Sequence, residues 1–393
     1  MAYFSIWLPY SSFRHISLPM ITMKGVYRIT SLNNYQAMVK HFQGNTKLLC
    51  LTLSIVAKYA IIIKIYAYKY PMEVYIMQLI TEESVQLYIN KCKAYIDFML
   101  SQQQWSGLTK SEIEQWLSNF RQLDIHEKYF AYKLLANLIY YSEKDVIDAL
   151  NEGIHSRLFN YKVLEKQISA KFGLSQQTIQ NIVKEELYNA RFIPLLDKNA
   201  PHESGNYVSR LLVQQGMINA SQSMFLDGIG DEFQKNTFKN LIIVDDCVGS
   251  GDQLREFWKS AKVSINSVSY SLEQFCTEND IEAYYLTLFG YDKSIFSLKK
   301  EIKNLKICCV RTLSDSQRVF SQNSYVWANE VEREKAVELF CALALENGLY
   351  LYGYKNLDFA FIMHQTIPDW TLPLFWQETP EWKLLMRRKN SNA

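Results

Sequence analysis

The residues best suited to chemistry follow an apolar stretch near the middle of the chain. Residues 240–244 lead directly into Asp245 and Asp246. Paired carboxylates at the end of a strand can accept hydrogen bonds from the vicinal hydroxyls of a sugar, or stabilise a positive charge that develops nearby. The segment that follows is rich in small residues and leads into an expected helix: Cys247, Val248, Gly249, Ser250, Gly251, Asp252 and Gln253.

This small-residue segment is suited to binding a phosphate. Gly249 and Gly251 can adopt backbone conformations that other residues avoid, so successive N–H groups can point at one anion while the helix N-terminus adds its dipole. Ser250 can supply a hydroxyl donor. The alternative is a tight turn beside two solvated carboxylates. An apolar strand, paired aspartates, Gly-Ser-Gly and an amphipathic helix in this order favour a site for a phosphorylated ribose.

The pattern around this segment predicts the elements that position it. From residue 190 onward, short apolar runs alternate with amphipathic helices, which indicates a parallel sheet. In open parallel sheets the ligand binds beyond the carboxyl ends of the strands, where Asp245 and Asp246 are expected. The expected strands are 192–196, 241–244, 283–289, 305–310 and 359–363, and the expected helices are 252–263, 294–303 and 331–346.

Residues 82–186 instead repeat apolar side chains at helical spacing. The predicted fold is therefore α/β, with a Rossmann-like parallel sheet in a domain 190–393 that is preceded by an all-α domain 72–189. Helices are expected at 112–120, 127–141 and 143–152, the last between Ser142 as N-cap and Gly153 as a stop.

Residues 164–185 resemble a helix-turn-helix, in which Ile168, Phe172, Leu174, Ile179 and Val183 would pack together. A helical hairpin packed on the next domain is the alternative, because the second helix contains no arginine. The side chains that would face a DNA major groove are Gln176, Gln177, Gln180 and Asn181.

The bulk composition restricts the class of protein. Lys and Arg number 42 against 40 Asp and Glu, so the formal charge of +2 gives no strong field for a polyanion. Seven cysteines occur without C-x-x-C spacing or a histidine cluster suited to zinc, which favours reduced thiols in a cytoplasmic protein. No protein-held metal site and no membrane partner are expected.

The first 71 residues differ from the rest, with few acidic groups, many aromatics and no persistent period. They form an N-terminal extension whose place in the native fold is left open, with translation from Met72 or Met77 as one alternative. Residues 48–63 are apolar, but Lys58 interrupts them, which argues against a membrane span.

Residues 242–251, with the sequence IIVDDCVGSG, resemble the ribose-phosphate loop of type I phosphoribosyltransferases. The resemblance implies a Rossmann-like sheet with a hood that binds 5-phosphoribosyl 1-pyrophosphate with magnesium. Asp245 and Asp246 would then contact the ribose hydroxyls, and residues 249–253 would surround the 5′-phosphate. Gln253 stands where that family usually has Ser or Thr, which removes one expected hydroxyl contact.

A second resemblance covers residues from about Trp116 to Trp376. It is to the phosphoribosyltransferase-like effectors of bacterial conflict systems, including those beside retron reverse transcriptases, and it implies a possible reverse transcriptase or nucleic-acid partner. The acceptor of the ribosyl group does not follow from it. The residues that carry it are 192–197, 203–205, 352–354 and 364–376.

Two further places carry candidate residues. Ser204 and Gly205 follow the first core strand and could present N–H groups to a pyrophosphate, with Lys198, His202 and Arg210 as nearby cations; the alternative is an ordinary connection with Ser204 as N-cap. His364 is either a general acid or base or a partly buried histidine bonded to backbone.

The leading interpretation is an effector enzyme that binds a phosphoribosyl or nucleotide ligand with magnesium and acts at the anomeric carbon, with Asp245 and Asp246 as catalytic residues. The alternative is a non-catalytic sensor that binds the same ligand and regulates DNA binding through the helix-turn-helix. A third is a partner-binding module with a vestigial pocket, suggested by Gln253.

Overall fold

The computed structural model describes residues 3–4, 20–22, 25–29, 81–120, 123–196 and 204–388. Its contacts divide the chain into two units, Met1–Thr81 and Glu82–Ala393. In the first unit β1 (Tyr3–Phe4), β2 (Met20–Thr22) and β3 (Gly25–Ile29) form a sheet in the order β1-β3-β2. The rest of the N-terminal extension, including residues 48–63, lies outside the described residues.

The second unit is built on the predicted parallel sheet. Its strands are β5 (Ala190–Pro194), β6 (Asn240–Val248), β9 (Glu282–Tyr291) and β10 (Leu305–Leu313), in the order β10-β9-β6-β5, and all neighbours are parallel. All four therefore end at one edge of the sheet. The strands are almost continuously apolar because both faces are covered by helices, and the expected α/β fold class is confirmed.

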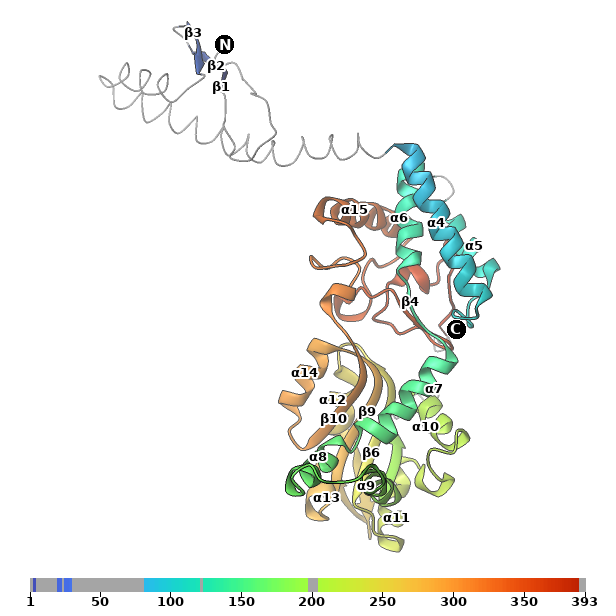
Figure 1. The fold of residues 1–393 in the computed structure, drawn as a ribbon, viewed down its shortest axis with the longest axis vertical. Helices are drawn as coiled ribbons and strands as arrows, with labels where there is room; N and C mark the ends of the chain where they lie inside the picture. The colour runs from blue at the N-terminus through green and yellow to red at the C-terminus, as the bar shows by residue number, and fades with distance from the viewer. Residues whose placement is uncertain are drawn as a thin grey trace, which may run out of the picture. The chain divides into compact units, whose positions relative to one another are not determined.

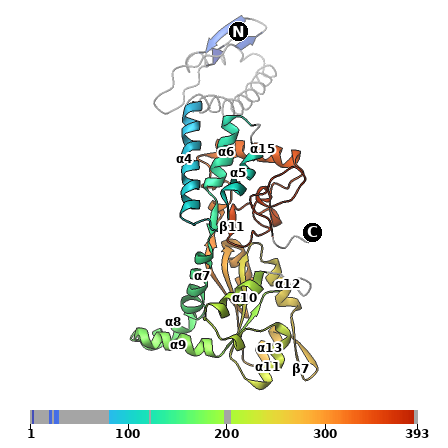
Figure 2. The same cartoon turned by 90° about the vertical axis from the view of Figure 1, so that its right-hand side faces the viewer.

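One face of the sheet packs against α11 (Ile229–Lys235), α12 (Asp252–Ser260), α13 (Leu272–Glu278) and α14 (Asp292–Glu301). The other face packs against α7 (Glu143–Glu152), α9 (Gln176–Tyr188) and α10 (Ser204–Gln214). The hairpin of β7 (Lys262–Ile265) and β8 (Val268–Ser271) follows α12. Figures 1 and 2 show the layers from two sides.

α7 ends at Glu152 with Gly153 as its C-cap, as predicted, and the chain continues as a π-helical turn over Gly153–Arg157. Ser142 is the N-cap of α7, as expected, and its side chain accepts a hydrogen bond from the N–H of Asp145. A Cβ on Gly153 would lie 3.1 Å from Leu286 and 3.1 Å from Val310. The glycine therefore permits close packing of this turn on the sheet.

A second set of elements, which we call the cap, consists of residues 82–141 and 319–388. It contains α4 (Glu82–Ser101), α5 (Lys110–Ser118), α6 (Ile125–Ala136) and α15 (Glu330–Glu346), and these gather at one end of the sheet (Figures 1 and 2). Its core contains buried aromatic residues from both segments, Trp116 and Phe120 with Phe340 and Phe375 among them.

Two strands of the cap differ from the sequence-based expectation. The helix expected at 127–141 ends at Ala136, and β4 (Ile139–Tyr141) follows it. β4 pairs in parallel with β11 (Phe361–Met363), so the last expected strand does not join the main sheet. Isolated 3-10 turns complete the second unit at Ala220–Gln222, Leu226–Gly228, Asp315–Gln317, Tyr354–Asn356 and Pro373–Phe375.

A buried ion pair joins the two segments of the cap. The Lys133 ammonium on α6 lies 2.7 Å from one Glu332 carboxylate oxygen on α15 and also donates to the Tyr129 hydroxyl at 2.9 Å. α4, α5 and α6 thus share one core with the chain after residue 319. α7 and α9 pack instead on the main sheet.

Candidate functional site

The two predicted aspartates end β6 and are both buried, at 2% exposure for Asp245 and 4% for Asp246. The Tyr285 hydroxyl on β9 donates to Asp245 Oδ2 at 2.8 Å, and the N–H of Asp246 donates to Asp245 Oδ1 at 3.0 Å. Asp246 Oδ1 accepts from the N–H of Cys247 at 2.6 Å. Because neighbouring strand residues face opposite sides, Asp245 faces the side of α12 and Asp246 the side of α10.

The small-residue loop turns into α12 as predicted. Gly251 has φ of 84°, in the left-handed region that favours glycine, and it is the N-cap of the helix. Ser250 Oγ accepts a hydrogen bond from the N–H of Asp252 at 3.2 Å. Within the part of the chain that the structure describes, the N–H groups of Ser250, Gly251 and Gln253 have no hydrogen-bond acceptor. Such a run of N–H groups at a helix N-terminus can bind an anion such as a phosphate.

The last part of the chain packs onto this loop. The indole of Trp370 is 4% exposed and lies directly over Gly249. The Tyr354 hydroxyl donates to Asp252 Oδ2 at 3.1 Å, and the Lys355 ammonium lies 3.3 Å from the same oxygen. Partial burial opposes ionisation of Asp252, but these two groups outweigh it and lower its pKa. The buried indole of Trp370 therefore packs against the loop that follows β6.

The loop proposed for pyrophosphate is only partly described. Residues 197–203, including Lys198 and His202, lie outside the described residues. Helix α10 begins at Ser204, directly after these residues. Gly205 is buried, and a Cβ there would lie 2.9 Å from the backbone nitrogen of Leu195. This close approach places the start of α10 at the carboxyl end of β5, beside the end of β6.

A cluster around His364 faces the same edge of the sheet. His364 is half-buried, and its backbone N–H donates to the backbone carbonyl of Tyr141 at 2.8 Å. Its Nδ1 lies 3.2 Å from Ser106 Oγ, and its Nε2 lies 3.9 Å from a carboxylate oxygen of Glu143. Ser106 and Glu143 carried no signal in the sequence, because each lies more than 200 residues from His364.

The thiol of Cys247 lies inside the loop, but its environment keeps it protonated. Burial raises its pKa well above the ordinary value, and the Asp246 carboxylate raises it further. The protonated thiol is a poor nucleophile. No group of three His, Cys, Asp or Glu side chains suited to a metal ion occurs among the described residues.

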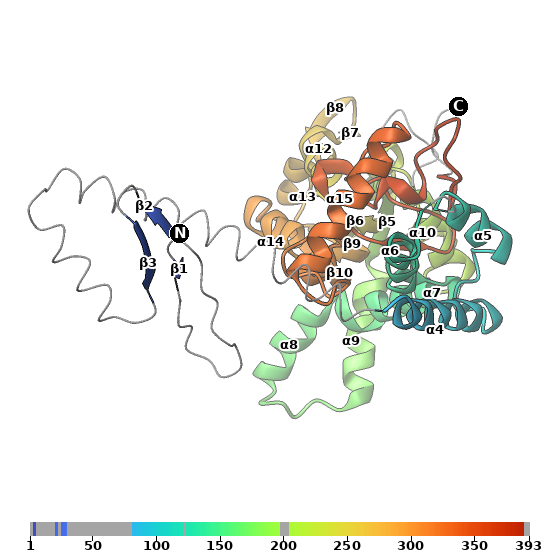
Figure 3. The ribbon, with the colours of Figure 1, turned by 90° about the horizontal axis from the view of Figure 1, so that it is seen from above.

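The DNA-contact residues predicted on α9 are all exposed: Gln176, Gln177, Gln180 and Asn181. α8 (Asn160–Ser169) and α9 extend from the sheet as a hairpin (Figure 3). The packing expected of a helix-turn-helix is wrong for Ile168 and Phe172, which are 57% and 69% exposed. Val183 is buried, but against the sheet layer.

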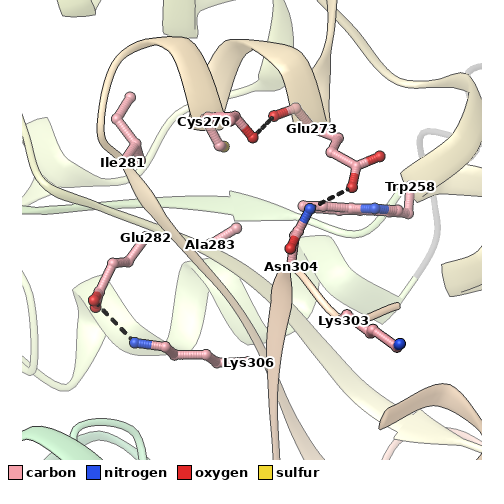
Figure 4. A pocket seen from close by; sticks show the side chains of 10 residues that line it. Trp258, Glu273, Cys276, Ile281, Glu282, Ala283, Lys303, Asn304 and Lys306 are labelled. Carbon is pink, nitrogen blue, oxygen red and sulfur yellow. Dashed lines mark hydrogen bonds and ion pairs between the residues drawn. The ribbon is translucent and has the colours of Figure 1, made fainter. Parts of the chain in front are cut away.

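A pocket of about 300 Å³ lies elsewhere (Figure 4). It includes the first residue of β9, Glu282, so it is at the opposite edge of the sheet from Asp245. Four of its polar side chains form two pairs: Asn304 donates to Glu273 at 2.8 Å, and Lys306 lies 2.9 Å from Glu282. The pocket is therefore separate from the predicted ribose-phosphate site.

A Rossmann-like sheet with buried aspartates, a phosphate-type loop and a cap at its carboxyl edge defines a type I phosphoribosyltransferase-like domain. A family model described as PRTase-CE matches residues 113–388, and the chain belongs to this family. The relation expected from residues 242–251 is thereby confirmed.

The structure is also similar to the crystal structure of orotate phosphoribosyltransferase from Aeropyrum pernix, with 12% identity and a TM-score of 0.21. That match covers 33% of this chain and 62% of the other, which is less than two thirds of its length. No curated protein matches the chain. Among the described residues, no helix is long and apolar enough to cross a membrane.

Proposed function

We propose that this PRTase-CE chain binds a phosphoribosyl compound, such as 5-phosphoribosyl 1-pyrophosphate or a nucleotide, at the carboxyl edge of its main sheet. The observation that carries this proposal is that the carboxylates and the free N–H groups lie on one continuous stretch of chain. A single strand, loop and helix place the carboxylates of Asp245 and Asp246 beside N–H groups that have no acceptor in the described part of the chain. The 5′-phosphate would bind residues 249–253, and the ribose hydroxyls would bind the aspartates.

Chemistry at such a site would act on the anomeric carbon. Cleavage or transfer there passes through a state with oxocarbenium character, which a nearby carboxylate stabilises. Asp245 accepts a hydrogen bond from Tyr285 and Asp246 accepts one from the N–H of Cys247, so we assign this role to the pair and not to one of them. The acceptor of the ribosyl group is left open.

Magnesium belongs to the proposal as part of the ligand. Mg²⁺ prefers oxygen ligands and usually keeps several waters, with one or two protein carboxylates and phosphate oxygens of the substrate. The donor set at the end of β6, two carboxylates without a third acidic or histidine partner among the described residues, fits that mode of binding.

Calorimetry with 5-phosphoribosyl 1-pyrophosphate and Mg²⁺ tests the proposal. We expect saturable binding by the wild type and a loss of at least tenfold in affinity for Asp246→Asn, because hydrogen bonds to a charged group contribute about 1.5–3 kcal/mol. Asp227→Asn removes the same charge from an exposed position and serves as the matched control. Unchanged binding or activity in the Asp245→Asn, Asp246→Asn double variant would refute the site.

We further propose that the ligand is used in a bacterial anti-phage or conflict system of retron type. Support comes from the resemblance carried by residues 192–197, 203–205, 352–354 and 364–376. Bacteria that express the wild-type gene should resist phage or arrest growth, and the Asp245→Asn, Asp246→Asn variant should not. Equal protection by the wild type and the variant would contradict a role of the site in defence. The absence of a reverse transcriptase gene beside this gene would contradict the retron context.

The second candidate is a ligand sensor that regulates DNA binding. The observation that favours it is the exposure of the four amide side chains on α9. Gln177→Ala with Asn181→Ala should then abolish a mobility shift with duplex DNA, and no phosphoribosyl compound should be turned over. Turnover by the wild type, or a shift that the substitutions leave unchanged, would exclude the sensor.

A further inference from the structure

The apolar side of α8 faces solvent. Tyr161, Leu164 and Ile168 on the helix and Phe172 in the turn after it, which we call the α8 stripe, are between 47% and 69% exposed. None of the residues of α8, all of which the structure describes, is buried. The apolar side of a surface helix normally packs on the core, and contiguous apolar surface that stays exposed marks a site of interaction. The function proposed above does not use this surface.

α9 supplies most of the packing that holds this hairpin on the sheet. Its Val183 and Leu187 are buried in the core of the main sheet, whereas α8 reaches that core through the partly buried Val163. The Lys162 ammonium joins α8 to the Glu186 carboxylate on α9 at 2.6 Å. A helix of ten residues is marginal in water on its own, because helices in proteins are stabilised mostly by packing of their apolar side. The α8 stripe is therefore a surface that a partner would stabilise.

The turn after α8 carries Phe172 at the end of the stripe. The N–H of Lys171 donates to the Ile168 carbonyl at 2.9 Å, and the N–H of Phe172 donates to the Gln167 carbonyl at 2.6 Å, which is the pattern of a Schellman motif. Lys171 and Phe172 have φ of 51° and 61°, in the left-handed region that residues other than glycine rarely adopt. Both the strained backbone and the exposed ring are unfavourable, which indicates that the ring has a role beyond the fold of the single chain.

The other end of the stripe adjoins the pocket at the opposite edge of the sheet from Asp245 (Figure 4). The ammonium of Lys306, which lines the pocket, lies 4.9 Å from the centroid of the Tyr161 ring. Glu282, which also lines it, lies 3.0 Å from the Lys162 ammonium. The pocket has a volume of about 300 Å³, and a cavity of about 150 Å³ already holds a benzene ring, so a phenyl ring fits. Its apolar lining consists of Trp258, Cys276, Ile281 and Ala283.

The spacing of the α8 stripe is nearly the same in both directions along the chain, with intervals of three, four and four residues. When a second copy of α8 lies antiparallel to the first, Leu164 faces Ile168 of the second copy and Tyr161 faces its Phe172. Phe172 of the second copy then lies beside Lys306, at the pocket. Two-fold symmetry repeats this contact, so each copy supplies one ring and one pocket and the interface closes on itself.

We propose that the α8 stripe is a homodimer interface, in which two copies of the chain pair their α8 helices antiparallel and Phe172 of each copy enters the pocket of the other. The interface goes beyond the function proposed above and does not depend on it, because the pocket lies at the opposite edge of the sheet from the phosphoribosyl site. One helix and one ring per copy make a small contact compared with the standard of about 800 Å² per partner, so we expect a dissociation constant in the micromolar range.

Sedimentation equilibrium of the full chain measures the proposed dimer. The wild type should dimerise, and Phe172→Ser and Ile168→Ser should each raise the dissociation constant at least tenfold, because each removes a large apolar side chain from the contact. Both side chains are exposed in the single chain, so the thermal unfolding temperature of the dilute variants should stay close to that of the wild type. Phe296→Ser is the matched control, because Phe296 is 60% exposed on α14, and it should leave the dissociation constant unchanged.

The pocket is tested from its own side. Thr277 is exposed and lines the pocket, so Thr277→Trp should block entry of the ring and raise the dissociation constant as Phe172→Ser does. The two changes together should raise it no further than either change alone, because they remove the same contact. Additive losses would overturn the placement of Phe172 in the pocket.

The direction of pairing is tested with Glu165. At 3.6 residues per turn, Glu165 lies beside the stripe and close to the two-fold axis, where it would face Glu165 of the second copy. Glu165→Gln removes this repulsion and should lower the dissociation constant about two- to fivefold at low salt. An unchanged or higher dissociation constant would contradict the antiparallel arrangement.

Three outcomes would overturn the dimer. The first is a wild type that stays monomeric up to about 100 µM, well above the expected dissociation constant. The second is a dimer that survives Phe172→Ser combined with Ile168→Ser. The third is a monomeric wild type whose mobility shift with duplex DNA is lost in these variants, which would assign the stripe to nucleic acid. Phe172→Ser should bind 5-phosphoribosyl 1-pyrophosphate as the wild type does, so failure of the dimer leaves the proposed function untouched.

Discussion

Replacing Gly249 by alanine tests how the cap holds the phosphate loop. The backbone of Gly249 is not in the left-handed region, so alanine is compatible with its conformation and only contacts oppose it. An added Cβ would lie 2.8 Å from Nε1 of Trp370 and closer still to Cδ1 and Cγ. Carbon atoms in contact are about 3.5–4.0 Å apart, so the indole or the loop must move by roughly 1 Å.

The indole has no room to move. Trp370 stacks on Phe361 with ring centroids 4.9 Å apart and meets the edge of Phe359 at 5.4 Å. Overpacking of such a core destabilises by about 1–3 kcal/mol. We expect Gly249→Ala to lower the free energy of unfolding by that amount and to weaken phosphoribosyl pyrophosphate binding, because the displaced segment is the phosphate loop itself.

Urea unfolding and calorimetry measure both effects. Gly228→Ala is the control, because Gly228 has an ordinary helical backbone and open space around its Cα, and it should stay within about 0.5 kcal/mol of wild type. In a Trp370→Leu background the penalty of Gly249→Ala should disappear, giving a coupling energy of about 1 kcal/mol or more. The same penalty in both backgrounds would refute the steric argument.

Three further changes test other contacts. Lys133→Met removes the cation from the Glu332 carboxylate, which keeps its hydrogen bond from Tyr129, and should destabilise by about 3–5 kcal/mol in urea unfolding, with most of the loss restored by adding Glu332→Leu. Tyr285→Phe removes the hydroxyl donor of Asp245 and should lower the free energy of unfolding by about 1–3 kcal/mol; an unchanged value would show that this bond is dispensable. Burial opposes ionisation of Glu282, but Tyr284, Lys306 and Lys162 outweigh it and lower its pKa from 4.5 to about 2. Because the folded pKa is the lower one, its contribution is present above pH 4.5 and is lost as the pH falls toward 2, so Glu282→Gln should flatten the loss of thermal stability over that range. Parallel curves for the variant and the wild type would contradict this.

The sheet and its loop could be predicted because their signals are local. An apolar run followed by Asp245, Asp246 and Gly-Ser-Gly lies within fourteen residues, and each strand of the main sheet contains a mostly apolar run. The predicted start of α12 at Asp252 is also confirmed. These elements follow from hydrophobic pattern and turn chemistry alone.

The cap could not be predicted in the same way. Ile139, Tyr140 and Tyr141 continue the helical spacing of α6, yet they form a strand because their partner, β11, lies more than 200 residues further on. The contacts of Tyr354 and Trp370 with the phosphate loop likewise depend on long-range packing.

The pairing of β4 with β11 also constrains the order in which the protein is made. A ribosome releases the chain from its N-terminus, so α4, α5 and α6 emerge long before residues 319–388, with which they share a core. The main sheet can form while these helices still lack half of their apolar contacts. Trp370 and Tyr354 reach the phosphate loop last. Newly made chains therefore gain the contact of the indole with Gly249 only after residue 370 has left the ribosome, and a chain truncated between residues 313 and 361 should form the main sheet without that contact.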